Sequence, residues 1–151
     1  MASLVFVCWG NICRSPIGER VAKKMADERG LGLDVSSFGL SAENNGHPID
    51  YRAVAVLEGS GYEADGHRAR QIGREDIETA DLVVAVEPYQ VDKLRLMAPG
   101  ADNIRLLNDF NPDLGPGTPL IDPWYGDDAG FHDTLADVEA AMPAILDEIK
   151  A

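Results

Sequence analysis

The residue types that could do chemistry are concentrated near the N-terminus, in the segment from Cys8 to Pro16, which reads Cys-Trp-Gly-Asn-Ile-Cys-Arg-Ser-Pro. The apolar, β-branched run Ser3–Cys8 is typical of a buried strand, and the pattern after Pro16 is helical. In a loop that joins a strand end to a helix start, unpaired backbone N–H groups and the positive end of the helix dipole converge. The spacing therefore predicts a binding site for an anion such as a phosphate group.

Individual side chains of this loop strengthen the predicted anion site. The Arg14 guanidinium can bind two phosphate oxygens at once, while Gly10 and Asn11 are residue types that accept a left-handed backbone in a tight turn. The same positive field favours the thiolate of Cys8 over its thiol, which predicts a cysteine nucleophile. Ser15 has two candidate roles, because its hydroxyl could donate to the Cys8 sulfur or cap the following helix.

The cysteines have two other interpretations. A cysteine at a strand end is usually a small buried apolar residue. A zinc site would need a second ligand pair beside Cys8 and Cys13, and the histidines are scattered singly at His47, His67 and His132. The order Cys, five residues, Arg, Ser favours the nucleophile, so we expect neither a metal nor a cofactor.

Strands alternate with helices along the chain. The apolar patterns predict strands at 3–8, 33–38, 81–86 and 104–107, and helices at 16–29, from about 50, at 74–79, at 88–97 and from about 131. Pro143 predicts a kink or break of the last helix near Met142. This alternation predicts a parallel sheet covered by helices on both faces, with ligands bound beyond the carboxyl ends of its strands.

The composition limits the classes of partner and location. A chain of 151 residues that is 45% apolar and 26% charged fits a single globular domain, 1–151. The net charge of −13 argues against nucleic acid and against an anionic membrane surface as partners. No apolar run approaches a membrane span, the N-terminus lacks a secretory pattern, and two cysteines suit a reducing compartment. We therefore expect a cytoplasmic protein.

The segment from Cys8 to Pro16, followed by Glu19, resembles the signature of the low-molecular-weight protein tyrosine phosphatases. Asp122–Tyr125, which reads Asp-Pro-Trp-Tyr, is similar to the family's Asp-Pro-aromatic-aromatic segment. His67, followed by Arg-Ala-Arg-Gln-Ile, is similar to a family histidine beneath the phosphate loop. The resemblance implies an α/β fold of three layers, flavodoxin-like, in which a four-stranded parallel sheet is flanked by helices.

The resemblance also implies a role for each motif. Cys8 would attack phosphotyrosine or a small aryl phosphate to form a phosphocysteine, with Asp122 as general acid and then as general base. His67 would support the loop in a network with Asn11 and Ser15. Without the family, Asp122 is an ordinary turn residue before proline and His67 a structural histidine. The implied phosphate- and substrate-binding residues are Trp9, Gly10, Asn11, Ile12, Cys13, Arg14, Ser15, Glu43, Trp124 and Tyr125.

The expected cleft has aromatic walls. Trp124 and Tyr125 offer flat faces on which a phenol ring can stack, in a cleft that admits phosphotyrosine and leaves phosphoserine short of the nucleophile. Trp9 is expected at the rim. Glu43 is expected at the opposite wall, where relatives often carry an aromatic or apolar residue, so we expect it to disfavour acidic phosphopeptides and to tolerate basic ones.

Cys13 lies where family members form a reversible disulfide with the nucleophile under peroxide. The alternative is that Cys13 is a small buried filler. The resemblance further implies phosphotyrosine proteins as partners, a cognate tyrosine kinase among them, and a monomer or weak dimer.

Three rival functions share parts of this pattern. An arsenate reductase of the same fold needs two further cysteines downstream, and the chain has none. A protein arginine phosphatase is expected to carry threonine where Ile12 stands. A catalytically silent phosphotyrosine-binding module is disfavoured because Cys8, Arg14 and Asp122 are all present.

Overall fold

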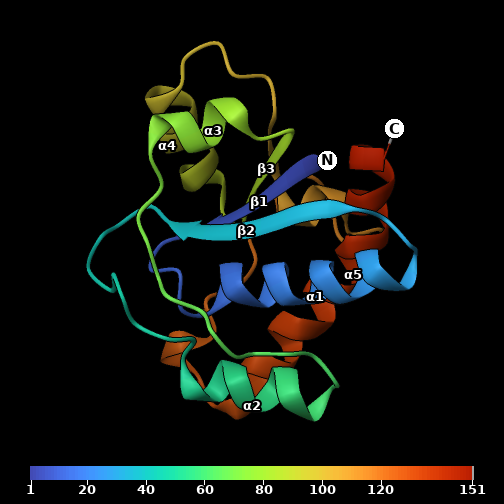
Figure 1. Cartoon of the computed structure of the whole chain (residues 1–151). Coiled ribbons are helices and arrows are strands. Elements are labelled where there is room, and N and C mark those ends of the chain that lie inside the picture. The colour runs from blue at the N-terminus through green and yellow to red at the C-terminus, as the bar shows by residue number, and fades with distance from the viewer. Residues whose placement is uncertain (151) are drawn as a thin grey trace.

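The computed structural model describes residues 1–150, apart from the side chains of Tyr125 and Lys150. Strands and helices alternate along most of the chain (Figure 1). In chain order the elements are β1 (Ala2–Cys8), α1 (Arg14–Glu28), β2 (Leu33–Gly39), α2 (Tyr51–Gly59), α3 (Arg74–Thr79), β3 (Leu82–Ala85), α4 (Pro88–Met97), β4 (Ile104–Leu106), the 3-10 turns η1 (Leu107–Phe110) and η2 (Pro123–Tyr125), and α5 (Asp128–Lys150).

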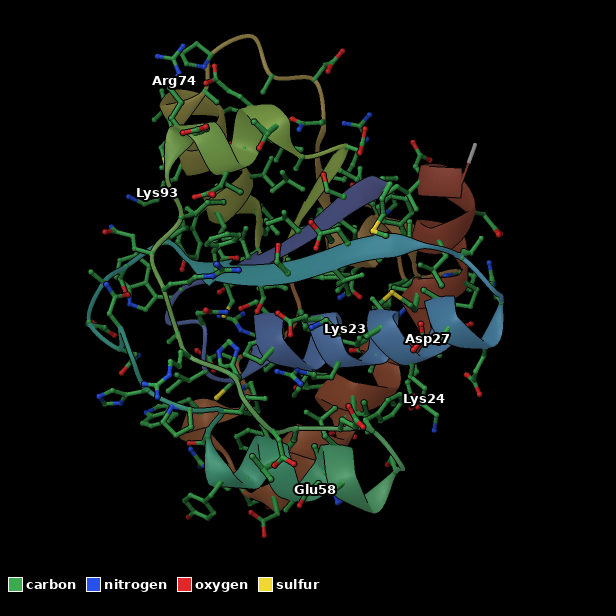
Figure 2. All side chains as sticks on the ribbon, viewed as in Figure 1. Lys23, Lys24, Asp27, Glu58, Arg74 and Lys93 are labelled. Carbon is green, nitrogen blue, oxygen red and sulfur yellow. The ribbon has the colours of Figure 1, made fainter. Side chains whose placement is uncertain are left out.

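The four strands form one parallel sheet in the order β2-β1-β3-β4. Alternate residues of β1 point to opposite faces: Leu4 and Phe6 pack with α1, α2 and α5, whereas Val5 and Val7 pack with α3 and α4. Figure 1 shows the sheet between these two helical layers, and Figure 2 shows the side chains that fill the space between them. The predicted three-layer α/β fold is confirmed.

The strand order creates a crevice at the carboxyl end of β1. The chain leaves β1 toward β2 on one side and returns to β3 on the other side, so the connections after β1 and β3 diverge at that edge. The loop 9–13 follows β1, and Glu87 follows β3 just before α4 begins. Residues far apart in sequence therefore meet at the place where α/β folds bind their ligands.

Two helix boundaries differ from the prediction. Helix α1 begins at Arg14, two residues earlier than expected, and α5 begins at Asp128. Of the predicted kink or break near Met142, the break is wrong, because α5 continues through Pro143 to Lys150. The kink stays a prediction. A proline in a helix costs about 3 kcal/mol, but Met142, Ile145 and neighbouring apolar residues of α5 are fully buried in the core. Their burial outweighs the local cost.

None of the helices within residues 1–150 has both the length and the apolar character that crossing a membrane requires.

Candidate active site

The sulfur of Cys8 lies at the carboxyl end of β1, where it is almost fully buried. Its Sγ is 3.0 Å from the Ser15 hydroxyl oxygen, and the backbone N–H of Asn11 donates to it over 3.3 Å. Donors directed at sulfur stabilise its anionic form. The surroundings of Cys8 thus suit a nucleophilic thiolate better than an inert core thiol.

Ser15 does not cap the helix, which corrects one of its two candidate roles. The N-cap position of α1 is Cys13, and within the described residues no side chain caps this helix. The Ser15 hydroxyl is engaged elsewhere: Asn11 Nδ2 donates to it over 2.9 Å, and its own proton can go to Cys8 Sγ or to the Phe38 carbonyl, 3.3 Å away. The N–H groups of the first turn of α1 remain available to an anion.

Asn11 holds the loop in its tight turn. Its φ of 59° lies in the left-handed region, which costs a residue other than glycine about 1–3 kcal/mol and requires support from its surroundings. Besides its bonds to Ser15 and Cys8, Asn11 is supported by three further hydrogen bonds: the side chain donates to Ser37 Oγ over 3.0 Å and accepts from Arg70 N over 3.0 Å, and the carbonyl accepts from His67 Nε2 over 2.6 Å. Asn11 is fully buried, so these bonds are not in competition with water.

The network beneath the loop extends from a carboxylate to the sulfur. Ser37 Oγ donates to Glu19 Oε1 over 2.9 Å, so Glu19, Ser37, Asn11 and Ser15 form a continuous chain that ends at Cys8. Such a chain fixes the orientation of each hydroxyl and amide in it. The sulfur is therefore positioned by side chains from the loop 9–13, α1 and β2 together.

His67 contacts the loop from beneath through one ring nitrogen. A carbonyl oxygen cannot donate, so the proton lies on His67 Nε2 and is given to the Asn11 carbonyl. Burial lowers the pKa of His67 below its ordinary value, and the hydrogen bond to Asn11 opposes part of that effect.

Arg14 is held by protein groups on one side and is open on the other. Its Nη1 donates to Glu87 Oε2 over 2.9 Å and to the Leu120 carbonyl over 2.8 Å, and its Nη2 lies 3.5 Å from Asp122 Oδ2. Both Nη1 hydrogens are thus engaged. Among the described contacts, the Nε–Nη2 edge of the guanidinium is the part left for two oxygens of an anion.

Asp122 lies just before η2 and caps it. Its Oδ1 accepts the backbone N–H of Trp124 over 3.0 Å, while Oδ2 faces Arg14. The Asp122 side chain is 37% exposed, against 3% for Arg14. Asp122 can therefore exchange protons with a bound molecule or with water.

These groups surround a cleft of about 190 Å³. It is lined by Cys8, Trp9, Gly10, Ile12, Cys13, Arg14, Glu43, Asn44, Asp122 and Trp124. Trp9 Nε1 donates to Glu43 Oε1 over 3.1 Å, so these two residues form one continuous part of the wall, and Trp124 contributes from η2. The predicted residues Asn11, Ser15 and His67 do not line the cleft and lie beneath it instead.

Comparison with known sequences identifies the family of this chain independently of the site geometry. Residues 3–151 match the family described as "Low molecular weight phosphotyrosine protein phosphatase". The chain belongs to that family. The low molecular weight protein-tyrosine phosphatase A of Mycobacterium tuberculosis is 39% identical over 147 residues, which cover 95% of this chain and 89% of the relative. The low molecular weight phosphotyrosine protein phosphatase of Sus scrofa is 32% identical over 152 residues, covering 98% of this chain and 96% of the relative.

A solved structure has the same fold as this chain. The crystal structure of a protein tyrosine phosphatase from Entamoeba histolytica superposes with a TM-score of 0.93 at 28% identity, over 99% of this chain and 97% of that one. The similarity covers all the elements that form the cleft.

Tyr125 and Cys13 are also site residues that the resemblance to the family predicts. The side chain of Tyr125 lies outside the described part of the chain, so its expected place in the wall stays a prediction. Cys13 is a buried free thiol. Burial first, and then the carboxylate of Asp50, raise the pKa of Cys13 well above its ordinary value. The reversible disulfide between Cys8 and Cys13 that the resemblance implies stays a prediction.

The sequence did not reveal the residues that hold the predicted catalytic motifs in place. Ser37, Glu87 and Arg52 belong to no local motif, and each acts on a residue distant in sequence. Of these three, Glu87 alone had a usable signal in the sequence: it directly follows the predicted strand 81–86, and α/β folds bind their ligands at the carboxyl ends of their strands.

Proposed function

We propose that this chain hydrolyses the phosphate ester of phosphotyrosine in proteins, and of small aryl phosphates, through a covalent phosphocysteine. The observation that carries the proposal is the set of donors around Cys8 Sγ, from Ser15 and from the Asn11 N–H, at the base of a cleft that Arg14 and Asp122 also line. Family membership supports the same reaction class. Proteins that a tyrosine kinase has phosphorylated are the proposed partners.

In the first step, Cys8 Sγ attacks phosphorus and the bond from phosphorus to the phenol oxygen breaks. The open edge of Arg14 and the N–H groups at the start of α1 bind the equatorial oxygens, where negative charge must be stabilised. Asp122, protonated, gives its proton to the departing phenol oxygen.

In the second step, water attacks the phosphocysteine while the ionised Asp122 accepts a proton from that water. Inorganic phosphate leaves, and the electron pair of the sulfur–phosphorus bond returns to Cys8. The Ser15 hydroxyl, 3.0 Å from the sulfur, can donate to the thiolate as it forms. The same contact that activates the nucleophile thus makes Cys8 a better leaving group.

The test uses two variants and two kinds of ester. We expect Cys8→Ser to lose turnover of p-nitrophenyl phosphate while it still binds inorganic phosphate, because the anion site survives the loss of the nucleophile. Asp122→Ala should lower kcat/KM for phenyl phosphate by about 100-fold or more, and much less for p-nitrophenyl phosphate, whose leaving group needs little protonation.

The exposed Asp127→Ala serves as the matched carboxylate control and should leave both rates unchanged. Equal losses for the two esters in Asp122→Ala would contradict the general acid. Faster turnover of phosphoarginine peptides than of phosphotyrosine peptides would favour the arginine phosphatase alternative, and phosphate-ester binding without turnover would favour the silent module.

We also propose that Glu43 sets a preference among phosphopeptides by charge. Among the described residues that line the cleft, Glu43 and Asp122 are the two carboxylates and Arg14 is the one cation, which already contacts Asp122 and Glu87. Glu43 Oε1 is engaged by the Trp9 indole, so its charge is held at the wall. An acidic residue beside the phosphotyrosine would meet this charge, whereas a basic one would be attracted to it.

Glu43→Gln separates the charge of Glu43 from its contact with Trp9, since the amide oxygen of glutamine can still accept from the indole. We expect the wild type to prefer a phosphotyrosine peptide with basic flanks over one with acidic flanks, and Glu43→Gln to reduce the ratio of the two kcat/KM values about threefold to tenfold. The exposed Glu63→Gln, outside the cleft lining, is the control. An unchanged ratio in Glu43→Gln would exclude the charge as the cause.

A further inference from the structure

Arg52, in the first turn of α2, is fixed by the residue that caps its own helix. Asp50 Oδ1 accepts from Arg52 N over 2.9 Å and from Arg52 Nε over 3.1 Å, and Asp50 Oδ2 accepts from Arg52 Nη2 over 3.4 Å. The Arg52 side chain is 18% exposed and the Asp50 side chain is 7% exposed. A guanidinium held on two oxygens by two of its nitrogens has one orientation, in contrast to a free surface arginine.

The opposite side of the Arg52 guanidinium reaches the segment that carries Asp122. Arg52 Nη1 donates to the Trp124 carbonyl over 3.3 Å, and its Cζ lies 4.9 Å from the centre of the Trp124 ring and 4.7 Å from that of Phe131. Cations above aromatic rings at such distances are attracted to them. Arg52 is absent from the cleft lining that includes Trp124, so it supports this tryptophan from outside the cleft.

The contacts of Arg52 join the two halves of the site. On one side, the Asp50 N–H donates to the carbonyl of Ile12, in the phosphate loop, over 2.8 Å. On the other side, the Trp124 N–H donates to Asp122 Oδ1 over 3.0 Å. A path of hydrogen bonds therefore leads from Ile12 through Asp50, Arg52 and the backbone of Trp124 to Asp122.

Two charged side chains from outside η2 contact the Asp122–Trp124 stretch: Arg14 and Arg52. Arg14 must turn its open edge to the substrate phosphate, so its contact with Asp122 weakens when substrate binds. Arg52 has no part in phosphate binding and keeps its contact throughout. We propose that Arg52 is a positioning residue that holds the general acid Asp122, and with it the Trp124 wall, over the phosphate loop during the first chemical step.

This inference rests on the proposed role of Asp122, and the experiment separates the two. The measured quantity is the ratio of kcat/KM for p-nitrophenyl phosphate to that for phenyl phosphate, in the wild type, Arg52→Ala, Asp122→Ala and the double variant. The ratio does not depend on how much of a preparation is folded, because the folded fraction cancels. Arg29→Ala is the matched control, since Arg29 forms a surface ion pair with Asp147.

We expect Arg52→Ala to lower kcat/KM for phenyl phosphate by about 10- to 100-fold, as a misplaced catalytic group does, and for p-nitrophenyl phosphate by less than about threefold. Inhibition by inorganic phosphate should stay within about twofold of the wild type, because the phosphate loop is intact. In the Asp122→Ala background, loss of Arg52 should not change the ratio further. Arg29→Ala should match the wild type throughout.

The inference is overturned if Arg52→Ala lowers kcat/KM equally for both esters. It is also overturned if Arg52→Ala changes the ratio as much in the Asp122→Ala background as in the wild type. If Asp122→Ala itself leaves the ratio unchanged, the proposed general acid is wrong, and the proposal for Arg52 falls with it. An altered ratio in Asp122→Ala together with an unaltered one in Arg52→Ala rejects the positioning role alone.

Discussion

At the scale of the residue, His67 links the protonation state of one imidazole to the shape of the phosphate loop. Its Nε2–H holds the carbonyl of Asn11, the residue with the left-handed backbone. A second proton on the ring would be buried and would need a new acceptor. Burial accordingly lowers the pKa of His67 from its ordinary 6.5.

This lowered pKa predicts a loss of stability in acid. Near pH 6.5 the unfolded chain takes up a proton on this histidine while the folded chain does not, so the free energy of unfolding is highest above that pH and falls as the pH decreases through it. Urea unfolding at pH 7.5 and 5.5 should show a larger decrease for the wild type than for His67→Gln, which keeps an N–H donor and cannot titrate. The exposed His132→Gln should behave as the wild type does. An equal decrease in His67→Gln would assign the pH effect to other groups.

At the scale of the element, the sequence predicted what is locally encoded. The strand β1, the loop after it and the helix α1 follow from a contiguous apolar run, a turn pattern and a helical period, and the bounds of each lie within two residues of the prediction. The capping role of Ser15 failed because its partners Cys8 and Phe38 are brought close by tertiary structure. The links from Glu87 to Arg14 and from Arg52 to Trp124 span 73 and 72 residues, so no local pattern could reveal them.

The close packing of α1 on β1 can be tested at Gly18. A Cβ at this position would lie 2.8 Å from Cδ1 of Phe6, whose ring is fully buried and cannot move aside. We expect Gly18→Ala to lower the free energy of unfolding by about 1–3 kcal/mol through overpacking, in spite of the gain of about 1 kcal/mol in helix propensity. In α2, Gly59→Ala meets no heavy atom within 4 Å and should stabilise instead. Urea denaturation measures the free energy of unfolding of both variants. A higher value for Gly18→Ala than for the wild type would disprove the tight contact.

At the scale of the whole molecule, the net negative charge of the protein repels the anionic substrate that we propose for the cleft. The net charge is −13, and among the lysines whose side chains the structure describes, Lys24 on α1 and Lys93 on α4 lie on opposite sides of the sheet (Figure 2). A dianionic ester is therefore repelled at long range and attracted only near the loop, by Arg14 and the helix α1. Salt shortens the range of the repulsion, since the screening length falls from about 30 Å at 0.01 M to about 10 Å at 0.1 M.

We therefore expect opposite salt effects for two phosphotyrosine peptides that differ only in flanking charge. Between 0.01 M and 0.15 M salt, kcat/KM should rise about twofold to threefold for the peptide with acidic flanks and fall for the one with basic flanks, because screening weakens repulsion and attraction alike. Sodium chloride and sodium acetate at equal ionic strength separate screening from competition by the added anion. If both peptides slow down together, anions compete at the phosphate loop and the global field has no measurable part in substrate capture.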